Sequence, residues 1–485
     1  MSHGQTCKTE FRNTAITQAM NRLASVALTA LLMAPPAALY AADVPVKSKP
    51  NIVFIMADDV TYKNLGCYGE KAIQTPNIDR LAQEGMKFTR AYCATAMCAP
   101  FRAEVFTGLY PVRSGVAWNH SAAKPDTKSI CHYLSGLNYR VGVAGKKHAG
   151  PADVFPFERV EDFPTGDGVR RFITRDPKQP FCLFLCSTLG HSPWRVGDTK
   201  QVDSRDITLP PTFHDNPITR QTYVAYLAEV AELDKQVGAI LRMVRDTGQE
   251  DSTLVMFSSE QGWAFAFGKW SNWDIGVHTA LIARWPGRIQ PGTVTDALVQ
   301  MADVTPTFIE AAGGDPVGFN LDGTSFLPVL TGAARTHREY VYGLHNNVRE
   351  GNPYPIRSIR DGEFHYILNL TPEESYHEKH LMTAASAAHY DLQWWQAMTD
   401  AAEQGDAVAK KLQQRLHHRP AEELYRVDAD PYELNNLAND PDCAAAKDRL
   451  RAELERWMKS QKDSGAALDS LQQPRMLGPW CGDWR

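Results

Sequence analysis

The chain has 485 residues, a length that suggests two domains or subdomains rather than one ordinary core. An apolar fraction of 43% and a charged fraction of 22% are typical of a folded globular protein and argue against a disordered chain. The formal net charge of -5 argues against a nucleic-acid partner, although a few local cations could still hold an anionic substrate.

The N-terminus has the pattern of a secretory signal. Basic residues precede an apolar run at residues 23–42, which Pro35 and Pro36 interrupt and a polar linker follows. The alternative is a membrane anchor, for which the run is short and broken. We therefore expect a signal peptide at residues 1–42, and a periplasmic or secreted protein with no integral membrane segment after its removal.

Nine cysteines occur in the chain, and Cys7 leaves with the expected signal peptide. The remaining cysteines show no CxxC pairing of the kind that binds metals. Cys182 and Cys186 lie in PFCLFLCS, where the period of a strand places both on one face, which favours buried thiols. Export permits disulfides, but the sequence assigns none.

Strand and helix patterns alternate from residue 50 to about residue 315. PNIVFIMADD (50–59) is a continuous apolar run ending in carboxylates, as expected of a buried parallel strand. Capping residues and periodicity predict helices at 75–85, 101–109, 129–137, 219–247 and 303–313, and strands at 139–146, 180–187, 253–259 and 279–287. This order predicts an α/β fold with a large, mostly parallel sheet and helices on both of its faces.

The pattern changes after about residue 336. Short strands with turns are expected at 338–345, 354–370 and 423–437, and a helix at 449–461. These elements predict a smaller α+β subdomain with a short antiparallel sheet. We place the α/β domain at residues 43–336 and the C-terminal subdomain at residues 337–485.

Three expected strands end in polar side chains. In open α/β sheets, binding sites form at the carboxyl ends of the strands, so groups far apart in sequence would meet there. The groups are Asp58 and Asp59, Lys146 and His148, and Glu260 and Gln261.

The segment MCAPFRAEVFTGLYPVRSG (97–115) carries the strongest local motif. Cys98, Pro100 and Arg102 stand in the order Cys-x-Pro-x-Arg, and a Thr-Gly pair follows at 107–108. Together with the preceding Asp-Asp strand end, the later GKKH and the later acidic-amide pair, this motif resembles the type I sulfatases. The resemblance covers about residues 50 to 460, and it implies an alkaline-phosphatase-like fold for the α/β domain.

In that family, the motif cysteine is oxidised to formylglycine. The resemblance therefore implies that Cys98 is the nucleophile and that a formylglycine-generating or anaerobic sulfatase-maturating enzyme is a partner. A hydrated aldehyde suits sulfate ester hydrolysis because one hydroxyl can attack sulfur while the other, once deprotonated, expels the sulfate. The alternative for Cys98 is a buried structural thiol.

The expected metal site contains hard oxygen ligands. Asp58, Asp59, Glu260 and Gln261 offer only oxygen atoms, which suits calcium or magnesium, and the resemblance adds modified Cys98 as a ligand of one Ca²⁺ ion. The family usually has Asp-Asn at the second pair, where this chain has Glu-Gln. Ligand geometry and metal preference are therefore open, and a solvated acidic strand end is the alternative for Glu260 and Gln261.

A set of basic side chains is expected around the nucleophile. By resemblance, Arg102 and Lys146 hold and polarise the formylglycine, and His148 hydrogen-bonds its hydroxyl and serves as base for the release step. His191, in LGHSPW, and Lys269, in GKWSNWDIG, would contact sulfate, with His191 protonating the leaving oxygen. Ordinary surface or core positions are the alternative for His191 and Lys269.

The substrate expected from the sequence is a sulfated saccharide. The segments 145–157, 354–370 and 423–441 are similar to heparan N-sulfatase, whereas Glu260-Gln261 and GKWSNWDIG resemble sulfatases of bacteria that degrade sulfated polysaccharides. Both N-sulfate and O-sulfate therefore stay open. Candidates for the sugar pocket, chosen because they can stack on sugar rings or bind their polar groups, are Trp118, His120, Trp194, His345, Asn346 and Arg357.

Two other functions remain open at this point. A phosphonate or phosphate ester hydrolase could share the fold and the motif, and comparison of sulfate with phosphate esters as substrates would distinguish it. A glycan-binding protein with an inactive site would result if Cys98 is never modified, which the mass of the peptide 90–113 would reveal.

Overall fold

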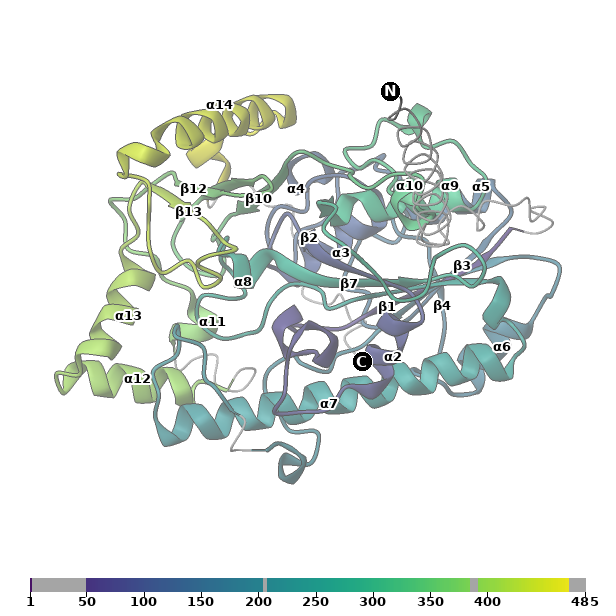
Figure 1. Ribbon diagram of the computed structural model, residues 1–485, viewed down its shortest axis with the longest axis horizontal. Coiled ribbons are helices and arrows are strands. Elements are labelled where there is room, and N and C mark those ends of the chain that lie inside the picture. Colours follow the sequence, from purple (N-terminus) through teal and green to yellow (C-terminus); the bar gives the residue numbers. More distant parts are fainter. Residues whose placement is uncertain (2–48, 204–206, 384–390, 471–485) are drawn as a thin grey trace. The chain divides into compact units, whose positions relative to one another are not determined.

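The computed structural model describes residues 49–203, 207–383 and 391–470, together with Met1 (Figure 1). The expected signal peptide at residues 1–42 lies outside the described residues. From Lys49 onward the chain forms one compact unit. Within the described part of the chain, none of the helices has the length and apolar character needed to cross a membrane.

A large sheet forms the centre of the α/β region. Among the described residues it contains nine strands in the order β4-β3-β5-β1-β6-β7-β2-β8, with β9 paired to β2. The strands are β1 (Asn51–Met56), β2 (Met86–Tyr92), β3 (Arg140–Gly145), β4 (Glu158–Arg159), β5 (Phe181–Cys186), β6 (Thr253–Ser258), β7 (His278–Arg284), β8 (Thr293–Thr295) and β9 (Val299–Gln300).

The middle of this sheet is parallel, as the sequence predicts. β3, β5, β1 and β6 run in the same direction, with Ile52 opposite both Cys182 and Leu254. β7 is antiparallel to both β6 and β2, so β2 again runs in the direction of β1. The carboxyl ends of β1, β2, β3, β5 and β6 therefore lie at the same edge of the sheet.

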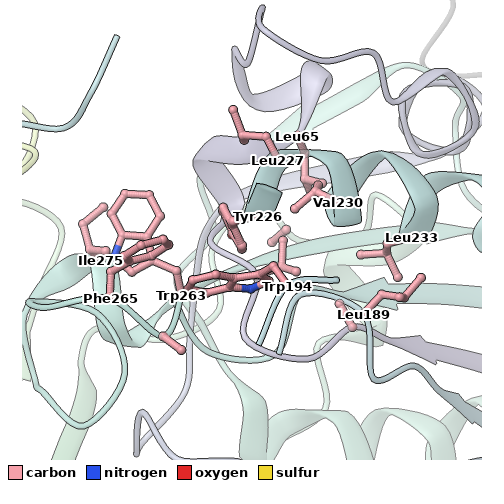
Figure 2. Close-up of a cluster of buried hydrophobic side chains, with 14 of the residues drawn as sticks. Leu65, Leu189, Trp194, Tyr226, Leu227, Val230, Leu233, Trp263, Phe265 and Ile275 are labelled. Atoms are coloured by element: carbon pink, nitrogen blue, oxygen red, sulfur yellow. The ribbon is translucent and has the colours of Figure 1, made fainter. Parts of the chain in front are cut away.

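Helices cover both faces of the sheet, which confirms the predicted layers (Figure 1). One face packs on α2 (Pro76–Gln83), α6 (Asp167–Thr174) and the long α7 (Pro217–Asp246), and alternate residues of β1 such as Val53 and Ile55 point to this side. Figure 2 shows part of this core, where Tyr226 of α7 packs against Trp194, Trp263 and Phe265.

The other face of the sheet packs on α3 (Cys98–Thr107), α5 (Ile130–Gly136) and α9 (Val304–Ala311). Cys182 and Cys186 both point to this side, which confirms the prediction of two buried thiols on one face. All seven cysteines in the described residues are free of disulfides. Short helices complete the region: α4 (Pro111–Ser114), α8 (Asp274–Val277) and α10 (Leu327–Leu330).

The C-terminal region contains the predicted antiparallel sheet and terminal helix. The sheet has the order β10 (Val341–His345), β11 (Ile356–Arg360), β12 (His365–Asn369) and β13 (Glu422–Tyr425), and α14 (Ala444–Gln461) packs on it. Three helices of this region were not predicted: α11 (Lys379–Met382), α12 (Gln393–Glu403) and α13 (Ala407–His417). α12 buries Trp394 and Trp395 against α7, which it could not do as an isolated segment.

The α/β region also contains elements that were not predicted, namely α4, α6, α8, α10, β4, β8 and β9, and two other differences have a clear physical reason. Strand β2 was not predicted, because MKFTRAY has no continuous apolar run and gains its partners only from distant β7, β8 and β9. The helix expected to follow Pro100 begins at Cys98 instead, and Pro100 lies in its first turn, where a missing N–H costs nothing. Cys98 therefore stands at the N-terminus of α3.

Candidate active site

The polar groups expected at the strand ends do converge at one edge of the large sheet. Asp58 and Asp59 follow β1, Glu260 and Gln261 follow β6, Lys146 and His148 follow β3, and His191 follows β5. The backbone turns sharply there, because Asp59, His148 and Glu260 have φ values of 58°, 45° and 66°. Such left-handed conformations are costly for residues with side chains and concentrate at functional sites.

Cys98 lies buried at the centre of this cluster. Its Sγ atom is 3.8 Å from Asp59 Oδ1 and 3.7 Å from Gln261 Nε2. Burial raises the pKa of the thiol to about 12, despite the opposing charges of Lys146 and Lys269. The unmodified side chain is therefore a neutral thiol at pH 7 and a poor nucleophile.

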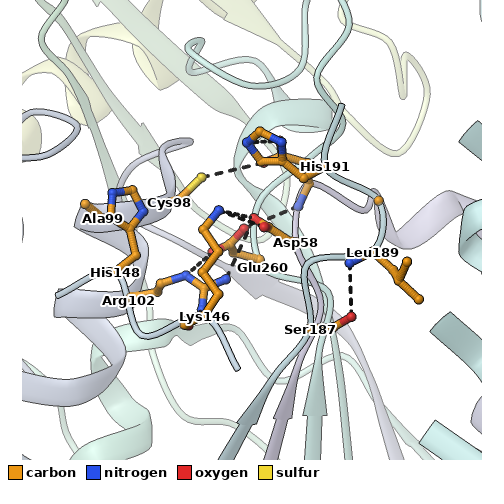
Figure 3. A network of polar contacts seen from close by, with 12 residues as sticks. Asp58, Cys98, Ala99, Arg102, Lys146, His148, Ser187, Leu189, His191 and Glu260 are labelled. Atoms are coloured by element: carbon orange, nitrogen blue, oxygen red, sulfur yellow. Dashed lines mark hydrogen bonds and ion pairs between the residues drawn. The ribbon is translucent and has the colours of Figure 1, made fainter. Parts of the chain in front are cut away.

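Three buried cations pair with the three carboxylates around Cys98, and Figure 3 shows two of these pairs, Lys146 with Asp58 and Arg102 with Glu260. Lys146 Nζ donates to Asp58 Oδ1 and Oδ2 at 3.0 and 2.7 Å, and Lys269 Nζ donates to Asp59 Oδ2 at 2.7 Å. Arg102 Nε lies 2.7 Å from Glu260 Oε1, and its Nη1 donates to the carbonyl of Lys146. Arg102 thereby ties the start of α3 to the ends of β3 and β6.

The charges within this cluster shift its carboxyl groups in opposite directions. Burial disfavours ionised Asp58, but Lys146, His191 and Arg102 outweigh burial and hold its pKa well below the usual range. Burial and the neighbouring charge of Asp58 raise the pKa of Glu260 to about 8, against the pull of Arg102. The three cations thus match the three carboxylates in number, and a bound divalent cation would favour the ionised form of Glu260.

The donor set fits a hard divalent ion. Ligand atoms of Asp58, Asp59, Cys98 and Glu260 all lie within 4.8 Å of one another. Gln261 Oε1 is buried and has no hydrogen-bond partner in the described part of the chain, so an amide oxygen remains available as a ligand. Three carboxylates and an amide oxygen, without an imidazole, are typical of calcium or magnesium sites.

Three histidines surround the cluster. His191 Nε2 lies 3.7 Å from Asp59 Oδ2, and burial and Lys269 lower the pKa of His191 to about 4. His148 Nε2 lies 3.0 Å from His120 Nδ1, and burial and Lys146 lower the pKa of His148 well below its usual value. His120, predicted as a sugar-pocket residue, thus contacts a residue of the central cluster.

The other sugar-pocket candidates have partners outside this cluster. Trp194 is buried and stacks on Phe265 at 4.5 Å, at the edge of a cavity of about 460 Å³ that Trp395 also lines. Trp118 Nε1 donates to Asp469 Oδ1 at 3.2 Å. Their contact with a sugar stays a prediction.

His345, Asn346 and Arg357 form a buried network within the C-terminal region. Arg357 donates to Asp463 through Nε at 2.5 Å and Nη2 at 3.0 Å, and to Asn346 Oδ1 at 3.1 Å. His345 Nε2 lies 3.3 Å from Asn347 Oδ1. These side chains stabilise the loops after β10 and α14, and their place in the sugar pocket also stays a prediction.

Trp270, His380 and Glu350 extend the network around Lys269, and none of the three was predicted from the sequence. Lys269 Nζ lies 4.7 Å from the ring centre of Trp270, and this ring stacks on His380 at 5.4 Å. His380 in turn contacts the buried carboxylate of Glu350. Trp270 follows Lys269 directly in GKWSNWDIG, and this position beside a predicted site residue was a signal for it. Glu350 and His380 belong to no motif that would indicate a site.

Fold and site together are typical of a hydrolase with an α/β fold. Its candidate nucleophile, cations and oxygen ligands meet at the carboxyl edge of a parallel sheet. The sequence profile of the Sulfatase family matches residues 50–166 and 152–314, and that of the C-terminal part of N-sulphoglucosamine sulphohydrolase matches residues 259–416. The chain therefore belongs to the sulfatase family and is a sulfuric ester hydrolase.

Individual relatives agree with this assignment. An ulvan-active sulfatase of Formosa agariphila is 34% identical over 433 residues, covering 86% of this chain and 82% of the relative. N-sulphoglucosamine sulphohydrolase of Homo sapiens is 26% identical over 486 residues, covering 89% and 94%. A solved structure in complex with its substrate D-glucosamine-2-N,6-O-disulfate has a TM-score of 0.63 at 20% identity, covering 86% and 99%, and shows the shared fold.

Proposed function

We propose that this protein hydrolyses sulfate esters, or an N-sulfate, of a sulfated glycan, using formylglycine made from Cys98 and one bound calcium ion. The observation that carries the proposal is the position of Cys98. It lies at the N-terminus of α3, within 4 Å of Asp59 and Gln261, and it starts the Cys-x-Pro-x-Arg motif. A buried thiol with a raised pKa is a poor nucleophile, which supports the modification of Cys98.

Asp58, Asp59, Glu260 and Gln261 would hold the cation together with the modified Cys98. When bound, the ion neutralises sulfuryl oxygens and lowers the pKa of a coordinated hydroxyl. Glu260 and Gln261 replace the Asp and Asn usual in the family, but their strand end supplies the same oxygen chemistry. Glu260 also holds Arg102 at 2.7 Å, so the longer carboxylate serves both the cation and the guanidinium.

Maturation would be a two-electron oxidation of Cys98: the bond between Cβ and sulfur breaks, sulfur leaves as hydrogen sulfide, water supplies the aldehyde oxygen, and the maturation enzyme supplies the electron acceptor. The hydrated aldehyde would offer one hydroxyl to attack sulfur, and the saccharide oxygen or nitrogen would leave with a proton from His191. The second hydroxyl would give its proton to a base, the bond between Cβ and the sulfate oxygen would break, and sulfate would leave. Water rehydrates the aldehyde.

The basic side chains support these steps. Lys146 and Arg102 lie beside Cys98 and orient the modified residue, with His148 as its further hydrogen-bond partner and as the base expected for release. Lys269 contributes positive charge for a sulfate oxygen. His191 is the most exposed of these groups, with 21% of its side chain accessible, so it can reach the leaving group. Its lowered pKa leaves it neutral without substrate, and the negative charge of a bound sulfate would raise that pKa and favour the protonated form that donates to the leaving group.

The substrate class rests on the relatives. One acts on ulvan, one is an N-sulphoglucosamine sulphohydrolase, and a protein of the same fold binds a disulfated glucosamine. We infer a sulfated saccharide as substrate, bound against His120, Trp194 and residues of the C-terminal region. The Trp270–His380 stack supports a contribution of residues 337–485 to this pocket, next to the catalytic domain at 43–336.

A secreted or periplasmic location follows from the expected signal peptide at residues 1–42. The function is tested by assaying the purified, matured protein on defined N-sulfated and O-sulfated saccharides, with phosphate and phosphonate esters in parallel. We expect sulfate release from at least one saccharide. Faster hydrolysis of phosphate or phosphonate esters would contradict the proposal, as would a mass of peptide 90–113 that shows only unmodified Cys98 in an active preparation.

A further inference from the structure

The side-chain amide of Asn119 has a fixed orientation. Ala99 N donates to Asn119 Oδ1 at 3.4 Å. Ala99 lies in the first turn of α3, where backbone N–H groups have no carbonyl partner within the helix. Because a backbone N–H can only donate, the oxygen of the amide faces Ala99, and the amide nitrogen must face the other way.

The amide nitrogen of Asn119 faces His120. Asn119 Nδ2 lies 3.3 Å from His120 Nε2. An amide nitrogen only donates, so His120 Nε2 must accept and cannot carry a proton. The proton of a neutral imidazole then lies on Nδ1. Burial lowers the pKa of His120 to about 4, which agrees with a neutral ring at pH 7.

The same reasoning extends to His148. His120 Nδ1 lies 3.0 Å from His148 Nε2. Since His120 carries its proton on Nδ1, it donates, and His148 Nε2 accepts. Because Nε2 accepts, it carries no proton and this ring is also neutral, in agreement with burial, Lys146 and His120 lowering the pKa of His148 well below its usual value. Its single proton therefore lies on Nδ1.

We propose that Asn119 and His120 are positioning residues that fix His148 as the Nδ1–H tautomer. In the resting enzyme, His148 then has no basic lone pair on Nδ1, and its Nε2 lone pair is engaged by His120. The tautomer assignment rests on hydrogen-bond geometry alone, whereas its meaning for catalysis rests on the proposed function.

This assignment changes the role expected of His148 in sulfate release. To act as a base through Nδ1, His148 must carry its proton on Nε2, and His120 must then carry its own on Nε2. Two hydrogen-bond donors, His120 Nε2–H and Asn119 Nδ2–H, would then face each other. The conflict is relieved only if the amide rotates, and the rotated amide loses its hydrogen bond from Ala99 N. Leaving buried donors without acceptors disfavours this state by about 10- to 100-fold. In the resting enzyme His148 is therefore a hydrogen-bond donor through Nδ1, and the base role proposed for it in sulfate release requires these protons to rearrange first.

Replacing Asn119 with aspartate should reverse the direction of the hydrogen bonds that run from Asn119 through His120 to His148. The carboxylate of Asn119→Asp accepts from both Ala99 N–H and His120 Nε2–H. His120 Nδ1 would then accept from His148 Nε2–H, which leaves a basic lone pair on His148 Nδ1. A matched control is Asn51→Asp, which adds the same charge to a buried asparagine at the start of β1, the far end of the strand from the site.

The test is nitrogen NMR of protein labelled with ¹⁵N-histidine, at about pH 8, above the ordinary histidine pKa of about 6.5. Signals are assigned by their loss in His120→Gln and His148→Gln, and thermal melts establish that each variant is folded. We expect Nδ1–H tautomers for both rings in the wild type and in Asn51→Asp, and Nε2–H tautomers in Asn119→Asp.

A wild-type His148 with its proton on Nε2 would overturn the proposal even if Asn119→Asp failed to fold. A folded Asn119→Asp variant that leaves His148 unchanged would also overturn it. The measurement needs no turnover, so absence of sulfatase activity would refute the proposed function without touching this inference. A merely structural role of Asn119 could lower activity but would not move the proton of His148.

Discussion

Replacing Glu260 with alanine should destabilise the metal-free protein by an amount that the structure defines. Glu260 Oε1 lies 2.7 Å from Arg102 Nε, and Glu260 Oε2 accepts from Asp59 N at 3.3 Å. Both side chains of the ion pair are fully buried. Removing one partner of a buried pair costs about 3–5 kcal/mol, because the remaining charge stays buried without compensation.

Two features place the expected loss at the lower end of this range, about 3 kcal/mol. Asp58 Oδ1 remains 3.7 Å from Arg102 Nη2 and compensates part of the charge. The pKa of Glu260 near 8 also means that its carboxyl is mostly protonated at pH 7 without the cation, which weakens the ion pair. A loss of this size is still a large part of the roughly 5–15 kcal/mol that stabilises a typical protein.

Calcium affinity, like stability, should fall more in Glu260→Ala than in Gln261→Ala. Glu260→Ala removes a charged ligand and should weaken calcium binding far more than Gln261→Ala, which removes a neutral one. Glu260→Asp should recover little affinity, because its carboxylate falls short by about one carbon–carbon bond, roughly 1.5 Å. Calcium–oxygen distances vary by only a few tenths of an ångström, so the shorter side chain cannot adapt by stretching.

Urea denaturation with chelator measures the loss of stability, and calorimetric titration with calcium measures the affinities of the wild type and all three variants. Gln261→Ala is the matched control for stability and should lose only about 1 kcal/mol. Equal stabilities of Glu260→Ala and Gln261→Ala would refute the argument from the buried ion pair. Equal calcium affinities would show that neither residue binds the cation directly.

Three further outcomes are expected. Cys98→Ala should fold but retain less than about a thousandth of the wild-type turnover, since losing a nucleophile commonly costs several orders of magnitude, and higher retained activity would contradict the nucleophile assignment. Chelator should abolish activity, and calcium should restore it better than zinc, because the ligands are oxygens without thiolate or imidazole. Full activity in protein shown to be metal-free by elemental analysis would remove the cation from the mechanism. Burial raises the pKa of Glu104 from 4.5 to about 8 despite hydrogen bonds from Ala94 and Ala302, so the folded state holds a proton that the unfolded state has lost. Its stabilising contribution is present at about pH 4 and is lost as pH rises towards 8. Relative to Glu104→Gln, the free energy of unfolding should fall by about 1.4 kcal/mol per pH unit. Urea denaturation from pH 5 to 8 that shows a constant difference between the two proteins would refute this.

The sequence alone was sufficient for those parts of the fold whose signal is local. The apolar runs of β1, β5 and β6 predict buried parallel strands whatever lies beside them, since only a strand covered on both faces is apolar throughout. Their polar ends then predict where the site lies, because parallel strands share one carboxyl edge. The Cys-x-Pro-x-Arg motif likewise carries its meaning within five residues.

Other elements exist only through distant partners, so the sequence did not reveal them. β2 has mixed polarity, and it becomes a strand because β7, β8 and β9 supply its hydrogen bonds. α12 and α13 were missed because their apolar residues gain burial only against α7 and one another. For such segments, tertiary packing rather than local propensity decides the structure.

The site divides in the same way. Residue types at strand ends indicated which side chains could meet, but only the fold determined their pairing: Arg102 with Glu260, Lys269 with Asp59, and His148 with His120. It also showed that Arg357, expected at a sugar, is paired with Asp463 in a buried network. Sequence determines the chemistry that each side chain can offer, whereas the partner that it finds depends on distances that only the folded chain sets.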